Sequence, residues 1–221
     1  MNDNGGFLPL AYSLSQMIPV RHNFSVSDQA FIKAYGSYPI NKITVCRAPL
    51  TKVINKALNV LTVGLWERAK AKYGYDAMFH LFLLIDIIDN SKNGKIITCI
   101  FEKNDTPRCH ELKEPLAQNT ETMGVQKQFV GTLKSALDAT ISDMGTSFWI
   151  YDAFTNNCQD MIIHFLGANN LLSPQLESFI KQPISSIVNE LPSYTGKVAN
   201  FLTNTSRKLR TLTGLGLPDL S

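Results

Sequence analysis

The sequence YDAFTNNCQD, residues 151–160, joins two apolar segments. The first segment, residues 148–151, is predicted to be a strand, and the second, residues 161–166, has the apolar spacing of a helix. Helices often begin at residues whose side chains accept a hydrogen bond from a free backbone N–H group of the first turn. Cys158 follows three such residues and is therefore predicted to lie at a helix N-terminus: Thr155, Asn156 and Asn157.

The position of Cys158 indicates a reactive thiol. The helix dipole and the free N–H groups of a first turn stabilise an anion, so they favour the thiolate over the thiol. The thiolate is the nucleophilic form of cysteine. The alternative interpretation is a small, buried hydrophobic residue in the first turn, which is common for free cysteines.

The composition is that of a globular protein. The 221 residues are enough for one large domain or for one domain with extensions. Hydrophobic residues make up 44% and charged residues 18%, which excludes a largely disordered chain. The net charge of +3, from 21 basic and 18 acidic residues, is too small to indicate a specific nucleic-acid-binding protein.

Three features predict a protein of a reducing compartment, the cytoplasm, without a transmembrane segment. The longest apolar run, residues 79–88, is about half of the ~20 residues that a spanning helix needs. The N-terminal residues lack the basic region of a secretory signal. The cysteines lie far apart and form no C-x-x-C pair, which argues against a disulfide framework: Cys46, Cys99, Cys109 and Cys158.

The hydrophobic pattern predicts an α+β fold in which a small antiparallel sheet packs with helices. Apolar strands at residues 78–86 and 95–102 form a hairpin around the polar residues 89–94. A weaker pattern indicates a strand at residues 108–112. Helices are predicted at residues 27–35, 49–61, 65–72, 129–145 and 174–180.

These elements divide the chain into three predicted parts. Residues 1–48 form an N-terminal extension without an assigned role. Residues 49–182 contain the core together with the helices that precede it. Residues 183–221 form a helical, mildly basic C-terminal extension, for which a solvated chain end is the simplest interpretation.

A cysteine nucleophile requires a base, which is normally a histidine held by a third polar group. His22 lies in a weakly patterned segment and His110 in a polar loop. His164 follows Cys158 by six residues on the same predicted helix, so it points about 240° away around the helix. His80 lies inside an apolar strand, where the imidazole needs hydrogen-bond partners. His80 is thus the best candidate, and the alternative is an ordinary core histidine.

The predicted hairpin places residues 102–104 across from His80. Glu102 ends the second apolar run, so its carboxylate is placed to hold the imidazole in one tautomer. A register slip of one residue moves Glu102 to the other face of the sheet, and Asn104 is then the alternative partner. The alternative interpretation of Glu102 is a solvated strand end.

The order of these features resembles the circularly permuted papain-like fold. In that fold a strand histidine, a polar residue on the next strand and an amphipathic helix precede an Asn-Cys pair that opens a helix. Here His80 precedes Cys158, whereas ordinary papain-like enzymes place the cysteine first. Residues 79–81 (FHL) and 156–160 (NNCQD) look like the permuted branch related to NlpC-type cell-wall peptidases, the PPPDE peptidases and the lecithin:retinol acyltransferase-like group.

Two further segments, residues 102–104 (EKN) and 151–154 (YDAF), resemble uncharacterised viral proteins. The resemblance covers about residues 75–182. The chain departs from the acyltransferase-like group, since it lacks the second polar residue and the Trp-Gly pattern beside His80. It also lacks the Gly-rich substrate loops of deubiquitinase-like members.

The resemblance implies a cysteine hydrolase, a thiol peptidase or amidase that cleaves an amide or isopeptide carbonyl through a thioester. Cys158 would be the nucleophile, His80 the general base and Glu102, or Asn104, the residue that orients it. The backbone N–H of Cys158 would contribute to an oxyanion hole. No cofactor and no metal are expected. The candidates for further substrate or oxyanion contacts are Tyr151, Asn157 and Gln159.

Two other functions remain open. The first is a lipid-directed phospholipase or acyltransferase, whose peripheral membrane contact would come from the basic tail in residues 183–221. The second is a non-catalytic viral structural or interaction protein that kept the fold. The expected partner is a protein, peptide or lipid substrate, in the host cell or in the virion. A zinc site is not favoured. Its ligands would be Cys109, His110, Cys158 and His164, and no pair of these residues has the short spacing that is usual for zinc ligands.

Overall fold

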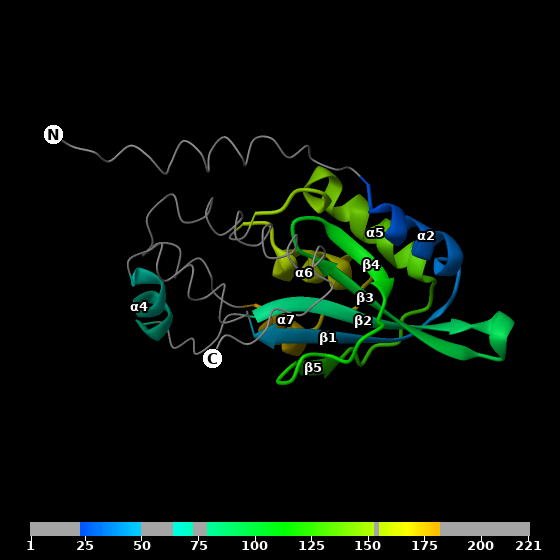
Figure 1. Ribbon diagram of the computed structural model, residues 1–221, viewed down its shortest axis with the longest axis horizontal. Coiled ribbons are helices and arrows are strands. Elements are labelled where there is room, and N and C mark those ends of the chain that lie inside the picture. Colours follow the sequence, from blue (N-terminus) through cyan, green and yellow to red (C-terminus); the bar gives the residue numbers. More distant parts are fainter. Residues whose placement is uncertain (1–22, 50–63, 73–78, 153–154, 182–221) are drawn as a thin grey trace.

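The computed structural model describes residues 23–49, 64–72, 79–152 and 155–181 (Figure 1). Of the helix predicted at residues 49–61, Pro49 instead ends a strand and residues 50–61 lie outside the described residues, as do the predicted C-terminal helices after residue 182. Within the described part of the chain, no helix is both long enough and apolar enough to cross a membrane.

An antiparallel sheet of five strands forms the centre of the fold, and its order is β4-β3-β2-β1-β5. The predicted α+β class with a small antiparallel sheet is confirmed. The predicted hairpin is confirmed as β2 and β3, and the weaker strand prediction as β4. The strands are β1 (Ile40–Pro49), β2 (Phe79–Asp89), β3 (Lys95–Lys103), β4 (Pro107–Glu111) and β5 (Glu121–Gly124).

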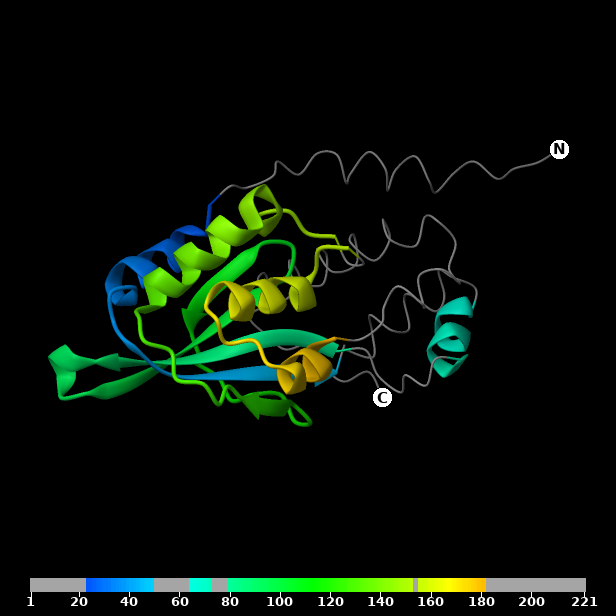
Figure 2. The same cartoon turned by 180° about the vertical axis from the view of Figure 1, so that it is seen from behind.

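Helices cover one face of this sheet, as Figure 2 shows. Helix α6 packs on β2 and β3, α5 packs on α6, and α7 packs on β1. Helix α2 packs on β4, at the edge of the sheet. The helices are α2 (Val26–Tyr35), α4 (Leu65–Lys72), α5 (Leu133–Met144), α6 (Cys158–Ala168) and α7 (Pro174–Ile180), and short 3-10 turns lie at η1 (Asn90–Lys92) and η2 (Gly145–Phe148).

The core lies between the sheet and the helices that cover it. Every second residue of β2, from Leu81 to Ile87, is fully buried on this side. Phe101 of β3 packs against two buried aromatic rings, Phe148 after α5 and Phe165 of α6. The intervening β2 residues, such as His80 and Asp86, lie on the opposite face and are less buried. The two faces of β2 therefore differ in burial, and the polar side chains of His80 and Asp86 lie on the less buried face.

The structure differs from the predicted N-terminal extension, because residues 23–48 contribute to the core. The helix predicted at residues 27–35 is present as α2. Strand β1 was not predicted, yet it lies between β2 and β5 in the sheet. The alternation of buried and exposed residues along β1 is irregular. The pairing register with β2 shifts between Ile40 and Lys42, and the consecutive residues Val45 and Cys46 are both fully buried. A strand covered on both faces does not alternate between apolar and polar residues.

The prediction of a strand at residues 148–151 is wrong. Residues Gly145–Phe148 form the 3-10 turn η2, and the backbone N–H groups of Trp149 and Ile150 donate to Thr146 O and Ser147 O. These local bonds leave the segment outside the sheet. Its apolar residues instead pack in the core, where Phe148 is fully buried and Trp149 packs edge-on against it.

Candidate active site

Cys158 is the first residue of α6, and Asn157 is the N-cap, as the sequence predicted. The Asn157 side chain accepts a hydrogen bond of 2.7 Å from Gln159 N, and the Asp160 side chain accepts one of 2.9 Å from Asn157 N. The Asn157 side chain also accepts a hydrogen bond from the backbone N–H of Asp160, and this reciprocal pair between Asn157 and Asp160 is a capping box, which holds the first turn in one geometry. The Cys158 side chain is thereby fixed at the positive end of the helix dipole.

The backbone of β2 contacts the sulfur of Cys158. The ladder between β2 and β3 ends at the pair Phe82 and Glu102. The preceding N–H group of β2, that of Leu81, donates to Cys158 Sγ at 3.5 Å. A hydrogen bond to sulfur stabilises the thiolate more than the thiol, because the acceptor is charged. The N-terminal part of β2 and the first turn of α6 are therefore in contact at the sulfur of Cys158.

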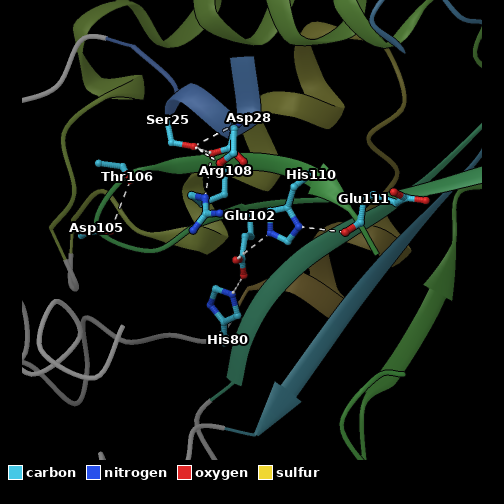
Figure 3. Close-up of polar contacts among 10 residues, drawn as sticks. Ser25, Asp28, His80, Glu102, Asp105, Thr106, Arg108, His110 and Glu111 are labelled. Atoms are coloured by element: carbon cyan, nitrogen blue, oxygen red, sulfur yellow. Dashed lines mark hydrogen bonds and ion pairs between the residues drawn. The ribbon is translucent and has the colours of Figure 1, made fainter. Parts of the chain in front are cut away.

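The imidazole of His80 is hydrogen-bonded to Glu102, and the side chains of both Cys158 and Glu102 act on its charge. Its Nε2 atom is 2.8 Å from Glu102 Oε2 (Figure 3). Glu102 pairs with Phe82, two residues after His80, so the two side chains are diagonal neighbours on one face of the sheet. Asn104, the alternative partner, lies after the end of β3, where its backbone N–H donates to Thr106 O. The structure thus brings Glu102, and not Asn104, to His80.

The charges of this group are linked. Burial disfavours the imidazolium, but the hydrogen bonds and negative charges of Cys158 and Glu102 prevail and raise the pKa of His80 to about 10. Burial also opposes the charge of Glu102, yet His80, His110 and Arg108 lower the pKa of its carboxyl. At neutral pH the pair is therefore a carboxylate and an imidazolium.

A second histidine lies beside the other oxygen of Glu102. His110 Nε2 is 4.0 Å from Glu102 Oε1, and His110 Nδ1 is 3.2 Å from Glu111 O (Figure 3). His110 was assigned to a polar loop, although the weaker strand prediction at residues 108–112 includes it, and the structure places it in β4. The period-two spacing of Arg108 and His110 was the available signal, because both residues share the Glu102 face of the sheet.

Strand β4, at one edge of the sheet, is attached to α2 by an ion pair. Arg108 Nε donates to Asp28 Oδ2 at 2.8 Å, and the Asp28 side chain is fully buried. Ser25, the N-cap of α2, donates to the same carboxylate oxygen at 2.6 Å. Arg108, which pairs with Glu102 in the sheet, therefore links α2 to β4, and its positive charge also acts on Glu102.

The oxyanion candidates have different surroundings. The Asn157 side chain caps α6, and the Gln159 side chain is buried. Tyr151 is half-buried in the connection before α6. A contact of these three side chains with a substrate stays a prediction.

The remaining histidines and cysteines lie elsewhere. His164 forms an exposed pair with Asp143 on the surface of α5 and α6, with Nδ1 2.6 Å from Oδ2. Cys46, Cys99 and Cys109 are fully buried free thiols, and His22 lies outside the described residues. Among the residues that the structure describes, no three His, Cys, Asp or Glu side chains form a group that could hold a metal ion.

Comparison of the chain with protein-family models, with curated proteins and with solved structures finds no match. The resemblance to the permuted papain-like fold therefore stays a hypothesis.

Proposed function

We propose that the protein is a cysteine hydrolase that cleaves amide or isopeptide bonds through a thioester. The observation that supports this proposal is the combination of His80 and Glu102, joined by a hydrogen bond, with Cys158, which lies at a helix N-terminus and acts on the charge of His80. A nucleophile, a proton carrier and an orienting carboxylate in this order form the catalytic arrangement of thiol hydrolases.

The proposed reaction begins from a thiolate and an imidazolium. The Cys158 thiolate attacks the carbonyl carbon, and the oxygen of the resulting tetrahedral intermediate takes the negative charge. The backbone N–H of Cys158, in the first turn of α6, is the proposed donor to that oxygen. The carbon–nitrogen bond then breaks, and His80 gives its proton to the leaving amine. A thioester on Cys158 remains.

Water completes the reaction. The neutral His80 imidazole takes a proton from water, which attacks the thioester carbonyl. The carbon–sulfur bond breaks, the acid product leaves, and the thiolate and imidazolium are restored. Glu102 keeps the imidazole in place through both steps, because its carboxylate accepts the hydrogen bond of Nε2.

The charge state of His80 favours an amide over an ester substrate. An amine leaves from a tetrahedral intermediate only after its nitrogen has been protonated, whereas the departure of an alkoxide depends less on protonation. A histidine with a pKa raised to about 10 enters the reaction already protonated. It therefore supplies the proton that amide cleavage requires.

Selective alkylation of Cys158 tests the proposed pair without a known substrate. Cys158 is itself buried but 7% exposed, whereas Cys46, Cys99 and Cys109 are fully buried, so we expect iodoacetamide at neutral pH to label Cys158 first in the folded protein. His80→Gln removes the imidazolium that stabilises the thiolate, so labelling of Cys158 should slow by at least about tenfold. Peptide mass spectrometry measures the label at each cysteine. Equal labelling of the four cysteines only after denaturation would contradict the proposal.

Replacing the orienting carboxylate should have a smaller effect. Glu102→Gln removes one charge-assisted hydrogen bond, worth about 1.5–3 kcal/mol, so we expect turnover to fall by about 10- to 100-fold. The pKa of His80 should also fall, and the alkaline limit of turnover should move to lower pH, because a negative charge beside the imidazolium is lost. The pH dependence of turnover measures both effects.

Glu111→Gln is the matched control for Glu102→Gln, since its side chain is exposed on the neighbouring strand β4. It should retain the turnover and the pH profile of the wild type. If Glu102→Gln behaves like Glu111→Gln, the carboxylate does not orient His80.

A further inference from the structure

Lys103, the last residue of β3, has a fully buried side chain. An ammonium group in the interior is destabilising unless hydrogen bonds and opposite charges compensate it. Lys103 Nζ donates to Ser147 O at 2.9 Å and to Asn156 Oδ1 at 2.8 Å. Both acceptors belong to the connection between α5 and α6. Lys103 therefore attaches β3 to the segment that leads into Cys158.

Asn156 extends this attachment along the connection. Its Nδ2 group donates to Ser147 O and to Ile150 O, each at 2.8 Å. Its backbone forms an antiparallel bridge with Asp152, through hydrogen bonds of 3.0 and 3.1 Å. Lys103 and Asn156 thus hold Ser147 and Asn156, the two ends of the connection, next to each other, two residues before Cys158.

The charges next to Lys103 belong to the start of α6. Burial lowers the pKa of Lys103 to about 8, while the negative charges of Asp160 and Cys158 act in the opposite direction. At neutral pH most Lys103 side chains are therefore still protonated and positively charged. Because the interaction is mutual, the same charge stabilises an anion at Cys158.

The last two residues of β3, Glu102 and Lys103, contact different parts of the site because their side chains point to opposite faces of the sheet. Successive side chains of a strand point to opposite faces, so Glu102 contacts His80 on one face and Lys103 contacts the Cys158 connection on the other. The strand end thereby holds both members of the proposed catalytic pair.

We propose that Lys103 is a positioning residue that holds the connection before Cys158 and stabilises the Cys158 thiolate with its buried positive charge. This inference rests on the proposed function, in which the thiolate is the nucleophile. Lys103 does not contact the substrate in this scheme, because its side chain is fully buried.

The rate of Cys158 alkylation by iodoacetamide, measured from pH 4 to pH 9, tests the charge of Lys103. The rate of a thiolate reaction rises with pH to a plateau, and the midpoint of this rise marks thiolate formation. Lys103→Met removes the charge and both hydrogen bonds, whereas Lys103→Gln keeps an N–H donor without charge. We expect both variants to shift the midpoint upward by on the order of one pH unit, or about tenfold in rate below the midpoint.

Lys95→Met is the matched control, because Lys95 is an exposed lysine of the same strand. It should leave the midpoint unchanged. An unchanged midpoint in both Lys103 variants, with rapid labelling of wild-type Cys158, overturns the role of Lys103 and leaves the proposed function intact. Slow labelling of Cys158 in the wild type itself, no faster than that of Cys46, overturns the proposed function instead.

A reciprocal measurement does not depend on the folding of Lys103 variants. Titration of the Lys103 side chain by NMR should give a midpoint near pH 8 in the wild type. Cys158→Ser removes the thiolate charge that supports the ammonium, so this midpoint should fall. An equal midpoint in the two proteins shows that the two groups are not coupled, and contradicts the proposal.

Discussion

Cys158→Ser should reduce the turnover of a susceptible amide by about 10⁴-fold or more. A serine hydroxyl is not ionised at neutral pH, and an imidazolium with a raised pKa does not accept its proton. The nucleophile is therefore lost even though the side chain keeps its place at the start of α6. Losses of this size are typical when one member of a catalytic group is removed.

The assay uses three probes: fluorogenic peptide amides, ubiquitin-type isopeptide conjugates and phospholipid vesicles. Release of product is compared between the wild type and Cys158→Ser for each probe. Turnover of the peptide or isopeptide probe supports the proposal. Turnover confined to phospholipid would replace the proposed substrate class by a lipid ester, while Cys158 would keep its role.

Cys46→Ser is the control for the loss of a thiol, because Cys46 is a buried thiol on the neighbouring strand β1. It should retain turnover. His80→Gln should lose nearly as much as Cys158→Ser, and the double variant should lose little more, since the two residues act as one unit. A Cys158→Ser protein that keeps wild-type turnover would rule out the thioester mechanism.

The linked charges of His80 and Glu102 should make the stability of the protein depend on pH. A histidine whose pKa is raised by folding stabilises the folded state fully below its unfolded pKa of about 6.5. This contribution is lost as the pH rises through the folded value of about 10. The free energy of unfolding should therefore decrease between these two values, by at most about 1.4 kcal/mol per pH unit for one proton.

Glu102 has the opposite dependence, because its pKa is lowered in the folded protein. Its contribution is complete above the unfolded value of about 4.3 and is lost as the pH falls through the folded value. The advantage of the wild type over His80→Gln should therefore be largest between about pH 4.5 and 6.5. Urea unfolding of both proteins at several pH values measures it.

The useful quantity is the difference between the two proteins in their free energy of unfolding, because groups that do not interact with His80 titrate equally in both. A difference that stays constant from pH 6 to pH 10 would show that His80 is not an imidazolium in the folded state. His164→Gln is the control, since its exposed pair with Asp143 is open to solvent, and an exposed ion pair contributes little.

Local patterns determined the elements that carry the site. Asn157 and Cys158 are predicted correctly at the start of α6, because capping depends on neighbouring residues only. The hairpin of β2 and β3 follows from two apolar runs around turn residues, and its register brings Glu102 to the face of His80. These contacts are short in sequence or joined by a tight turn, so the pattern predicts the elements, and the structure decides between Glu102 and Asn104 as the partner of His80.

The strand β1 and residues 148–151 depend on the tertiary structure. Strand β1 is buried on both faces at Val45 and Cys46, and its partner β2 lies far along the chain. The apolar residues 148–151 were predicted to form a strand, but Phe148 packs in the core and the backbone closes local turns. An apolar run shows that a segment is buried, and it does not show against which element.

The sequence by itself determined the α+β class, the capped cysteine and the hairpin that holds His80 and Glu102. Only the tertiary structure decided that Cys158 meets Leu81, that His110 lies beside Glu102, and that Lys103 is buried under the connection to α6. The physical reason is distance along the chain. Local hydrogen bonds and periodicity are encoded by neighbouring residues, whereas these contacts form only when α6 packs on the end of the sheet.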